Sequence, residues 1–140
     1  MYHYSVDHIR ELRQQIELYA LSAPPEFFLT DDASLQTAYN GIGPESWCPV
    51  FRNLTSFLLQ FFEADALIHD FEYSGKAKSY SHFTQANLRF AWNAAKLAFS
   101  RIGSLQKAVK VAALGLLLAL LCQLFGYEGY TTVQTGEEEK

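Results

Sequence analysis

The segment 50–74 reads VFRNLTSFLLQFFEADALIHDFEYS, and it decides the fold that we predict. Its apolar residues recur at three- and four-residue steps, which is the spacing of one face of an α-helix. Further apolar positions widen this stripe, so we expect a long helix that is largely buried. The stripe consists of Phe51, Leu54, Leu58, Phe61, Phe62, Asp65, Ile68, His69 and Tyr73, with Phe57, Leu59 and Leu67 beside it.

Two shorter helices are predicted on the N-terminal side of this segment. Residues 5–21 place apolar side chains on one helical face, with charged residues between them. Pro24 and Pro25 end this helix, because proline cannot donate the backbone hydrogen bond that a helix interior needs. Asp31 and its neighbours then offer caps for a short helix over 33–38. The face of the first helix consists of Val6, Ile9, Leu12, Ile16, Tyr19 and Ala20.

A second long helix is predicted after a polar connection at 75–81. Thr84 is its expected N-cap, and it runs to about Arg101. The connection is short, so this helix should run antiparallel to the one before it. The pairing would place His69, near the end of one helix, beside Asn87, near the start of the next. No stretch alternates apolar and polar residues, so the predicted fold class is all-α.

The last helix, predicted over about 105–127 with Ser104 as its cap, is unusually apolar. The twelve residues 111–122 have no polar side chain. The seventeen residues 111–127 are short for a membrane span, which needs about 20. Two interpretations stay open. One is a buried core helix, which Gly115 and Gln123 favour; the other is a membrane anchor with the preceding lysines on the cytoplasmic side.

Composition limits the class of protein. The 140 residues predict a single domain at 1–127, followed by a mobile acidic tail at 128–140. The net charge of −4 argues against nucleic-acid binding, because phosphate contact needs a basic face. Cys48 and Cys122 are too few for a disulfide framework, so we expect both to pack as small apolar side chains. The polar N-terminus shows no signal peptide.

Two local patterns carry chemistry. In Tyr39-Asn-Gly41-Ile-Gly43, the glycines let the backbone turn its carbonyls inward, and such oxygens suit Ca²⁺; an ordinary tight turn is the alternative. In His69-Asp70-Phe-Glu-Tyr73, a charged aspartate in an apolar stretch is costly unless it is paired or bound to metal. His69 and Tyr73 share a helical face. A core histidine beside an aspartate that reaches solvent is the alternative here.

These patterns, followed by Ala86-Asn87-Leu-Arg-Phe90, resemble in order the motifs of the phospholipase A2 superfamily. The likeness is closest to the disulfide-poor phospholipase domains of parvovirus capsid proteins, and it covers roughly residues 37–95. In that family, a calcium loop precedes two antiparallel helices that carry the catalytic site. The resemblance therefore implies a phospholipase A2-like fold, with the apolar C-terminal helix added.

The resemblance also implies a role for each matched residue. The backbone carbonyls of Tyr39, Gly41 and Gly43 and the carboxylate of Asp70 would hold Ca²⁺. His69 would deprotonate the water that attacks the sn-2 ester of a membrane phospholipid. Asn87 would orient the imidazole by accepting from Nδ1–H, and Tyr73 would hydrogen-bond this orienting residue.

One departure from the family supports a second hypothesis. The family has aspartate where this chain has Asn87, and an amide cannot stabilise an imidazolium with a full charge. We therefore expect low activity, unless Asp65, one turn before His69, substitutes. The alternative is an inactive phospholipase-like fold that binds membranes or serves virion or phage assembly. Localisation at a membrane or virion through 111–127, and a homo-oligomer, stay open as hypotheses.

Overall fold

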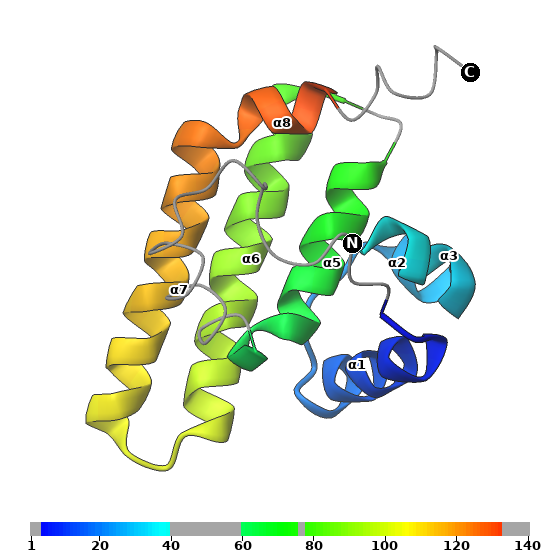
Figure 1. The fold of residues 1–140 in the computed structure, drawn as a ribbon. Coiled ribbons are helices and arrows are strands. Elements are labelled where there is room, and N and C mark those ends of the chain that lie inside the picture. Colours follow the sequence, from blue (N-terminus) through cyan, green and yellow to red (C-terminus); the bar gives the residue numbers. More distant parts are fainter. Residues whose placement is uncertain (1–3, 40–59, 76–77, 133–140) are drawn as a thin grey trace.

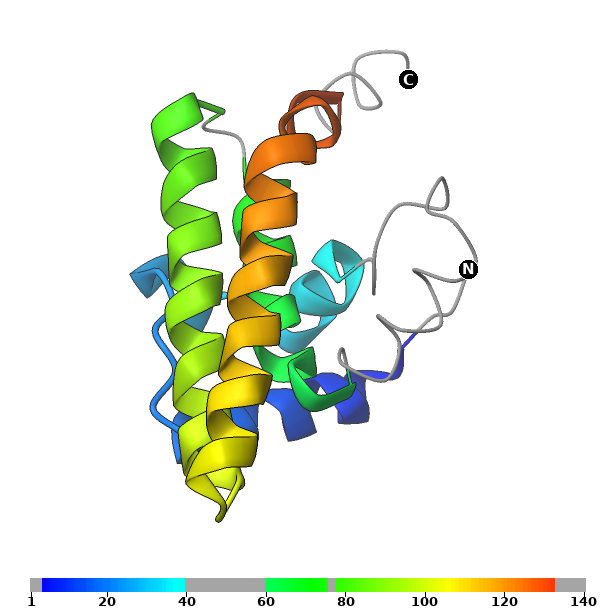
Figure 2. The ribbon, with the colours of Figure 1, turned by 90° about the vertical axis from the view of Figure 1, so that its left-hand side faces the viewer.

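A computed structural model describes residues 4–39, 60–75 and 78–132. These residues form helices and short connections with no strand, which confirms the all-α class. Three long helices lie side by side, and α1 crosses near one end of them (Figures 1 and 2). The long helices are α5 (Glu63–Ser74), α6 (Tyr80–Arg101) and α7 (Leu105–Phe125).

Helix α6 lies between its two neighbours and runs antiparallel to both (Figure 1). It begins five residues earlier than the sequence predicts, because Ser79 rather than Thr84 is the N-cap and accepts from the backbone N–H of His82. Thr84 lies inside the helix. The predicted end at Arg101 is confirmed. Phe83, Ala86, Phe90, Ala94 and Leu97 form much of its buried side.

The N-terminal helices pack against the three long helices. Helix α1 (Val6–Leu18) buries Ile9, Leu12 and Ile16. Its end comes earlier than predicted, and Ala20 adopts a left-handed backbone with a φ of 49° instead of joining the helical face. Helix α3 (Asp32–Ala38) has Asp31 as its N-cap, because the Asp31 carboxylate accepts from Ser34 N–H.

Helix α2 (Pro25–Leu29) is absent from the sequence-based prediction. The sequence uses Pro24 and Pro25 only as the end of the first helix, but Pro25 is also the first residue of α2. Proline fits the first turn, where the missing amide proton has no helical partner to lose. The turn buries Phe27 against the ring of Phe71 on α5, with the ring centroids 5.4 Å apart.

Helix α7 lies close against α6 because Gly115 leaves room for it. A Cβ atom at this position would lie 2.5 Å from Ala94 Cβ and 3.2 Å from Phe62 Cζ. Only a small part of α7 is buried, however. It is long and apolar enough to cross a membrane, with a mean hydropathy of 2.2, and 22% of its most apolar window is buried.

Helical structure continues beyond the domain end predicted at 127. Helix α8 (Tyr127–Thr132) crosses the end of the three-helix row (Figure 1). Tyr130, which the sequence assigns to the polar tail, is 1% exposed. Residues 133–140 lie outside the described residues, as do the first ten positions of the helix predicted at 50–74, Cys48, Gly41 and Gly43.

Candidate functional site

His69 and Asn87 meet across the antiparallel pair α5–α6. His69 lies in the second half of α5, and Asn87 lies two turns into α6. His69 Nε2 is 2.9 Å from Asn87 Oδ1. The two residues therefore come together as the short connection between their helices predicts. The nitrogen is Nε2, however, and not the Nδ1 that we expected from the sequence.

Tyr73 completes this contact from the next turn of α5. Its hydroxyl donates to the same Asn87 Oδ1 over 2.8 Å, and its ring lies 4.1 Å from that of His69 between centroids. The ring of Phe90 also packs against the imidazole, with the ring centroids 5.3 Å apart. The amide oxygen of Asn87 thus accepts from two groups that α5 presents one turn apart.

Aromatic rings from α8 cover the end of this cluster. Tyr130 packs against Tyr73 with centroids 5.1 Å apart and against Phe83 at 5.4 Å. Tyr127 packs against Phe83 at 5.2 Å. These contacts exclude water from the α8 side of Tyr73, and desolvation raises the pKa of the Tyr73 phenol. Tyr73 therefore acts as a hydrogen-bond donor across the physiological pH range.

Gln123 is part of the cluster, although the sequence pattern does not predict it. It lies near the end of α7, and its Oε1 accepts from Asn87 Nδ2 over 2.8 Å. Its Nε2 is 3.1 Å from both the Tyr80 hydroxyl and Thr84 Oγ1. The signal in the sequence was a single polar residue in an apolar helix, since a polar group there needs partners.

Desolvation keeps the imidazole of His69 neutral. It lowers the pKa of His69 from 6.5 to about 4, and the hydrogen bond with Asn87 opposes this only in part. Because Asn87 Oδ1 is an acceptor, Nε2 carries the proton in this arrangement. The lone pair then lies on Nδ1, which has no hydrogen-bond partner in the described part of the chain. His69 is therefore neutral, with its lone pair on Nδ1.

The charge of Asp70 raises the pKa of two groups outside its own helix. Burial raises the pKa of the Tyr39 phenol, and the charges of Glu63 and Asp70 raise it further. Burial and the Asp70 charge also raise the pKa of the Cys122 thiol to about 11. The carboxylate thus lies within electrostatic reach of Tyr39, where α3 ends and the glycine motif begins.

The described residues supply only part of the predicted calcium site. The carboxylate of Asp70 is the kind of hard oxygen ligand that Ca²⁺ prefers. Gly41 and Gly43 lie outside the described residues, so their carbonyls are not placed. In the part that the structure does describe, no three His, Cys, Asp or Glu side chains group to hold a metal ion.

Asp65 does not take over the orienting role that Asn87 was expected to perform poorly. Both of its carboxyl oxygens are buried and make no hydrogen bond. Nearby Asn93 lowers the pKa of Asp65, and the Asn93 amide itself bonds the N–H and C=O of Ser22. Desolvation dominates and raises the pKa of Asp65 well above 3.8. Asp65 is a buried, protonatable carboxyl that makes no hydrogen bond to the imidazole.

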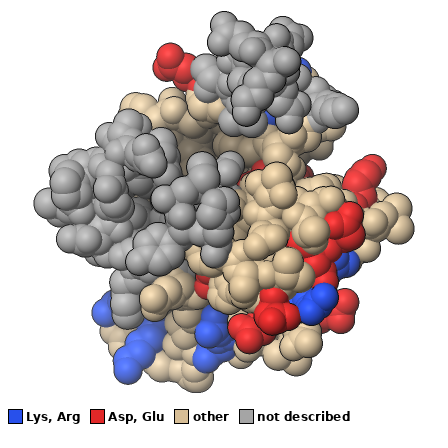
Figure 3. Space-filling model, turned by 45° about the vertical axis from the view of Figure 1, so that its right-hand side comes forward, with Lys and Arg blue, Asp and Glu red and all other residues tan. Residues whose placement is uncertain are grey.

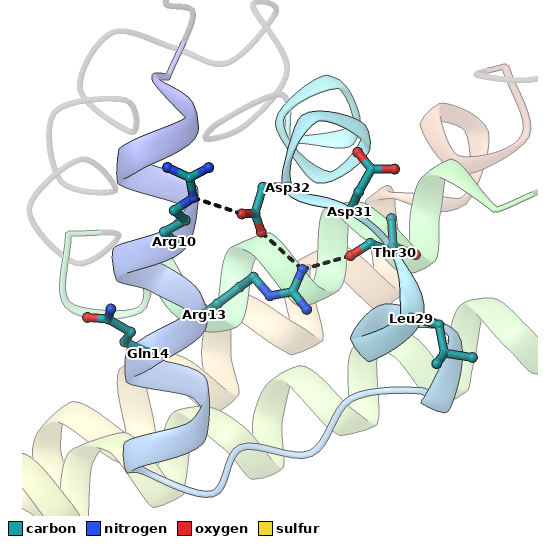
Figure 4. A pocket seen from close by; sticks show the side chains of 7 residues that line it. All are labelled: Arg10, Arg13, Gln14, Leu29, Thr30, Asp31 and Asp32. Atoms are coloured by element: carbon teal, nitrogen blue, oxygen red, sulfur yellow. Dashed lines mark hydrogen bonds and ion pairs between the residues drawn. The ribbon is translucent and has the colours of Figure 1, made fainter.

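An open hollow of about 550 Å³ lies elsewhere, between α1 and the connection from α2 to α3 (Figure 4). Its cations are already neutralised. Arg10 Nε is 3.0 Å and Arg13 Nη1 is 3.1 Å from the carboxylate of Asp32, and Arg13 also donates to the carbonyl of Thr30. These bonds hold α1 against α3, so we assign the hollow a role in the fold.

Comparison with known proteins identifies no relative: no family model, curated protein or solved structure matches this chain.

Proposed function

We propose that this chain hydrolyses the sn-2 ester of membrane glycerophospholipids, with His69 as general base and Ca²⁺ as cofactor. One observation carries the proposal: His69 Nε2 is held 2.9 Å from Asn87 Oδ1, which leaves the lone pair on Nδ1. The resemblance of the three motifs to the phospholipase A2 superfamily supports the choice of substrate.

Each side chain of the cluster has a part in this chemistry. His69 Nδ1 takes a proton from the attacking water, and Asn87 and Tyr73 hold the ring in one orientation. Asp70, with the carbonyls of Tyr39, Gly41 and Gly43, would hold Ca²⁺. The bound ion supplies polarisation of the ester carbonyl and stabilisation of the oxyanion.

The surface of α7 supports a lipid partner. Its outward side carries large apolar residues that are half exposed or more, a larger apolar area than a solvated helix shows. Lys107 and Lys110 are exposed near its start, and Figure 3 shows lysine and arginine side chains at the lower end of the molecule. Apolar area beside cations suits an anionic lipid surface. The exposed residues are Val109, Leu116, Leu117, Leu120 and Leu124.

The experiment is fatty-acid release from mixed phospholipid vesicles by the purified chain, with Ca²⁺ and with excess chelator. We expect release that the chelator abolishes, and His69→Ala should remove it. His82→Ala is the matched control, because His82 is exposed on α6 and should leave release unchanged. Release that persists in His69→Ala would contradict the proposal.

A second candidate is a membrane-binding protein with a phospholipase-like fold and no catalysis. The pKa of His69, lowered to about 4, favours it, because so weak a base accepts a proton from water poorly. The uncharged Asn87 adds no stabilisation to an imidazolium. This candidate predicts vesicle binding without release.

Calorimetry with Ca²⁺ separates the two candidates. An enzyme binds Ca²⁺ and loses this binding in Asp70→Asn, whereas a fold without a working calcium loop binds none. The third possibility, a membrane anchor formed by α7, requires detergent for solubility. A chain that stays monomeric in detergent-free buffer would contradict the anchor.

A further inference from the structure

Gln123 is a polar side chain on the most apolar helix of the chain, and it joins three helices. It bonds Asn87 Nδ2 over 2.8 Å, and through Asn87 it is connected to His69 and Tyr73 on α5. A side chain that only filled space here would be apolar, since an amide in an apolar helix must recover the cost of its desolvation.

The two ends of an asparagine amide have the same shape but opposite hydrogen-bonding roles. If Asn87 presents its oxygen to His69, Nε2 must carry the proton and Nδ1 keeps its lone pair. If Asn87 presents its nitrogen instead, Nε2 must accept, and the proton moves to Nδ1. The orientation of one amide thus decides which imidazole nitrogen is a base.

The partner at the far end of the Asn87 amide selects between these orientations. Gln123 offers an oxygen there, so Asn87 must present Nδ2 to it and Oδ1 to His69. The nitrogen of Gln123 lies against the hydroxyls of Tyr80 and Thr84, which accept from it. A carboxylate at position 87 would accept at both ends and would need no such selection.

We propose that Gln123 is a positioning residue that sets the orientation of the Asn87 amide and thereby keeps the lone pair of His69 on Nδ1. This inference rests on the proposed function for its catalytic meaning, because Nδ1 is the nitrogen assigned to the water. The tautomer itself is a property of the folded chain and requires neither lipid nor Ca²⁺.

The test is two-bond ¹H–¹⁵N NMR of the full chain labelled with ¹⁵N-histidine, at pH 7, where His69 is neutral. We expect the wild type to show His69 as the Nε2–H tautomer. Gln123→Met keeps the length of the side chain but removes the acceptor, so the Nδ1–H tautomer should become populated to a comparable extent. Gln123→Glu keeps an acceptor and should retain the Nε2–H tautomer. Gln106→Leu, at an exposed position of α7, is the matched control.

Two results would overturn the proposal: an Nδ1–H tautomer in the wild type, or a pure Nε2–H tautomer in Gln123→Met. The first needs no variant, so the test stands even if Gln123→Met fails to fold. Vesicle assays on the same samples separate this inference from the proposed function. Absent release from the wild type contradicts the enzyme, whatever the tautomer. With an active enzyme, Gln123→Met should lower kcat at least about threefold and leave KM unchanged.

Discussion

The imidazole of His69 is held by the neutral amide of Asn87 rather than by a carboxylate. The imidazole is therefore a weaker base. Asn87 accepts from His69 Nε2 and from the Tyr73 hydroxyl, but it brings no charge to balance an imidazolium. Desolvation then lowers the pKa of His69 to about 4 without an opposing carboxylate. The same cluster would be a stronger base if its orienting residue were charged.

Asn87→Asp should therefore raise both the pKa of His69 and the rate of lipid hydrolysis. Loss of the corresponding carboxylate costs a catalytic triad about 10⁴ in rate, so we expect a gain of roughly ten- to a thousandfold. Gln123 accommodates the change by turning its amide. The measurements are a histidine NMR titration and vesicle assays. Gln85→Glu, the same change at an exposed position of α6, is the control, and an unchanged rate would contradict the assigned role of Asn87.

The buried carboxyl of Asp65 predicts a loss of stability as pH rises above about 4. Its pKa is raised in the folded chain, so folding retains a proton that the unfolded chain releases above about pH 4. The free energy of unfolding then falls as pH rises, by up to about 1.4 kcal/mol per pH unit, until the folded pKa is passed. His69 acts oppositely: its lowered pKa stabilises the fold above pH 6.5, and this contribution is lost toward pH 4.

Asp65→Asn removes the carboxyl that retains this proton, so the variant should lose less stability than the wild type as pH rises above about 4. Urea denaturation at several pH values measures it. A variant with the same slope as the wild type would show that Asp65 is ionised in the folded chain.

Helix α7 combines close packing on one side with exposed leucines on the other. Gly115 allows α7 to approach Ala94 and Phe62, and this approach brings Gln123 within reach of Asn87. The outward side keeps residues such as Leu120, 51% exposed, and Leu124, 64% exposed. The helix thus serves the polar cluster through its inner side and presents a lipid-compatible surface on its outer side.

Gly115→Ala should destabilise the fold, although alanine is the better helix former. The added Cβ would lie 2.5 Å from Ala94 Cβ, and overpacking of this kind costs about 1–3 kcal/mol. The gain in helix propensity is about 1 kcal/mol. Urea denaturation measures the net change. Gly129→Ala in α8 is the control, because a Cβ there meets nothing within 4 Å. Equal stability of Gly115→Ala and the wild type would contradict the close contact.

The His69 cluster and the lysines of α7 lie toward opposite ends of the molecule. The three long helices bring the His69 cluster together near the end that α8 covers, whereas Lys107 and Lys110 lie near the opposite end of α7. An apolar helix with cations at one end would lie along an anionic membrane surface, with its long axis near the membrane plane. This orientation places the polar cluster beside the lipid rather than within it.

The double variant Lys107→Glu/Lys110→Glu should bind anionic vesicles more weakly. Each lysine near such a surface contributes about 1 kcal/mol, so we expect a loss of at least about tenfold in the partition coefficient. Vesicle co-sedimentation measures it. Binding to zwitterionic vesicles is the control and should not change. Equal binding of the variant and the wild type to anionic vesicles would mean that this end does not face the membrane.

Local pattern determined the helical class, most helix positions and the pairing of His69 with Asn87. Periodic apolar residues favour helices wherever they occur, and a short connection leaves an antiparallel return as the simplest path. Capping was predicted less well: Ser79 and Thr84 are both good caps, and packing selects between them. Helix α2 was not predicted, because the pair Pro24-Pro25 indicates the end of a helix as readily as the start of one.

Only the tertiary structure decided which atoms meet. It selected Nε2 rather than Nδ1 of His69, isolated Asp65 from the imidazole and brought Gln123 to Asn87. The physical reason is that helix rotation and side-chain rotamers follow from packing between segments that are distant in the sequence. Gln123 lies 36 residues from Asn87, and its position depends on the approach that Gly115 permits. The sequence by itself placed residues on helices, and packing alone turned their side chains toward one another.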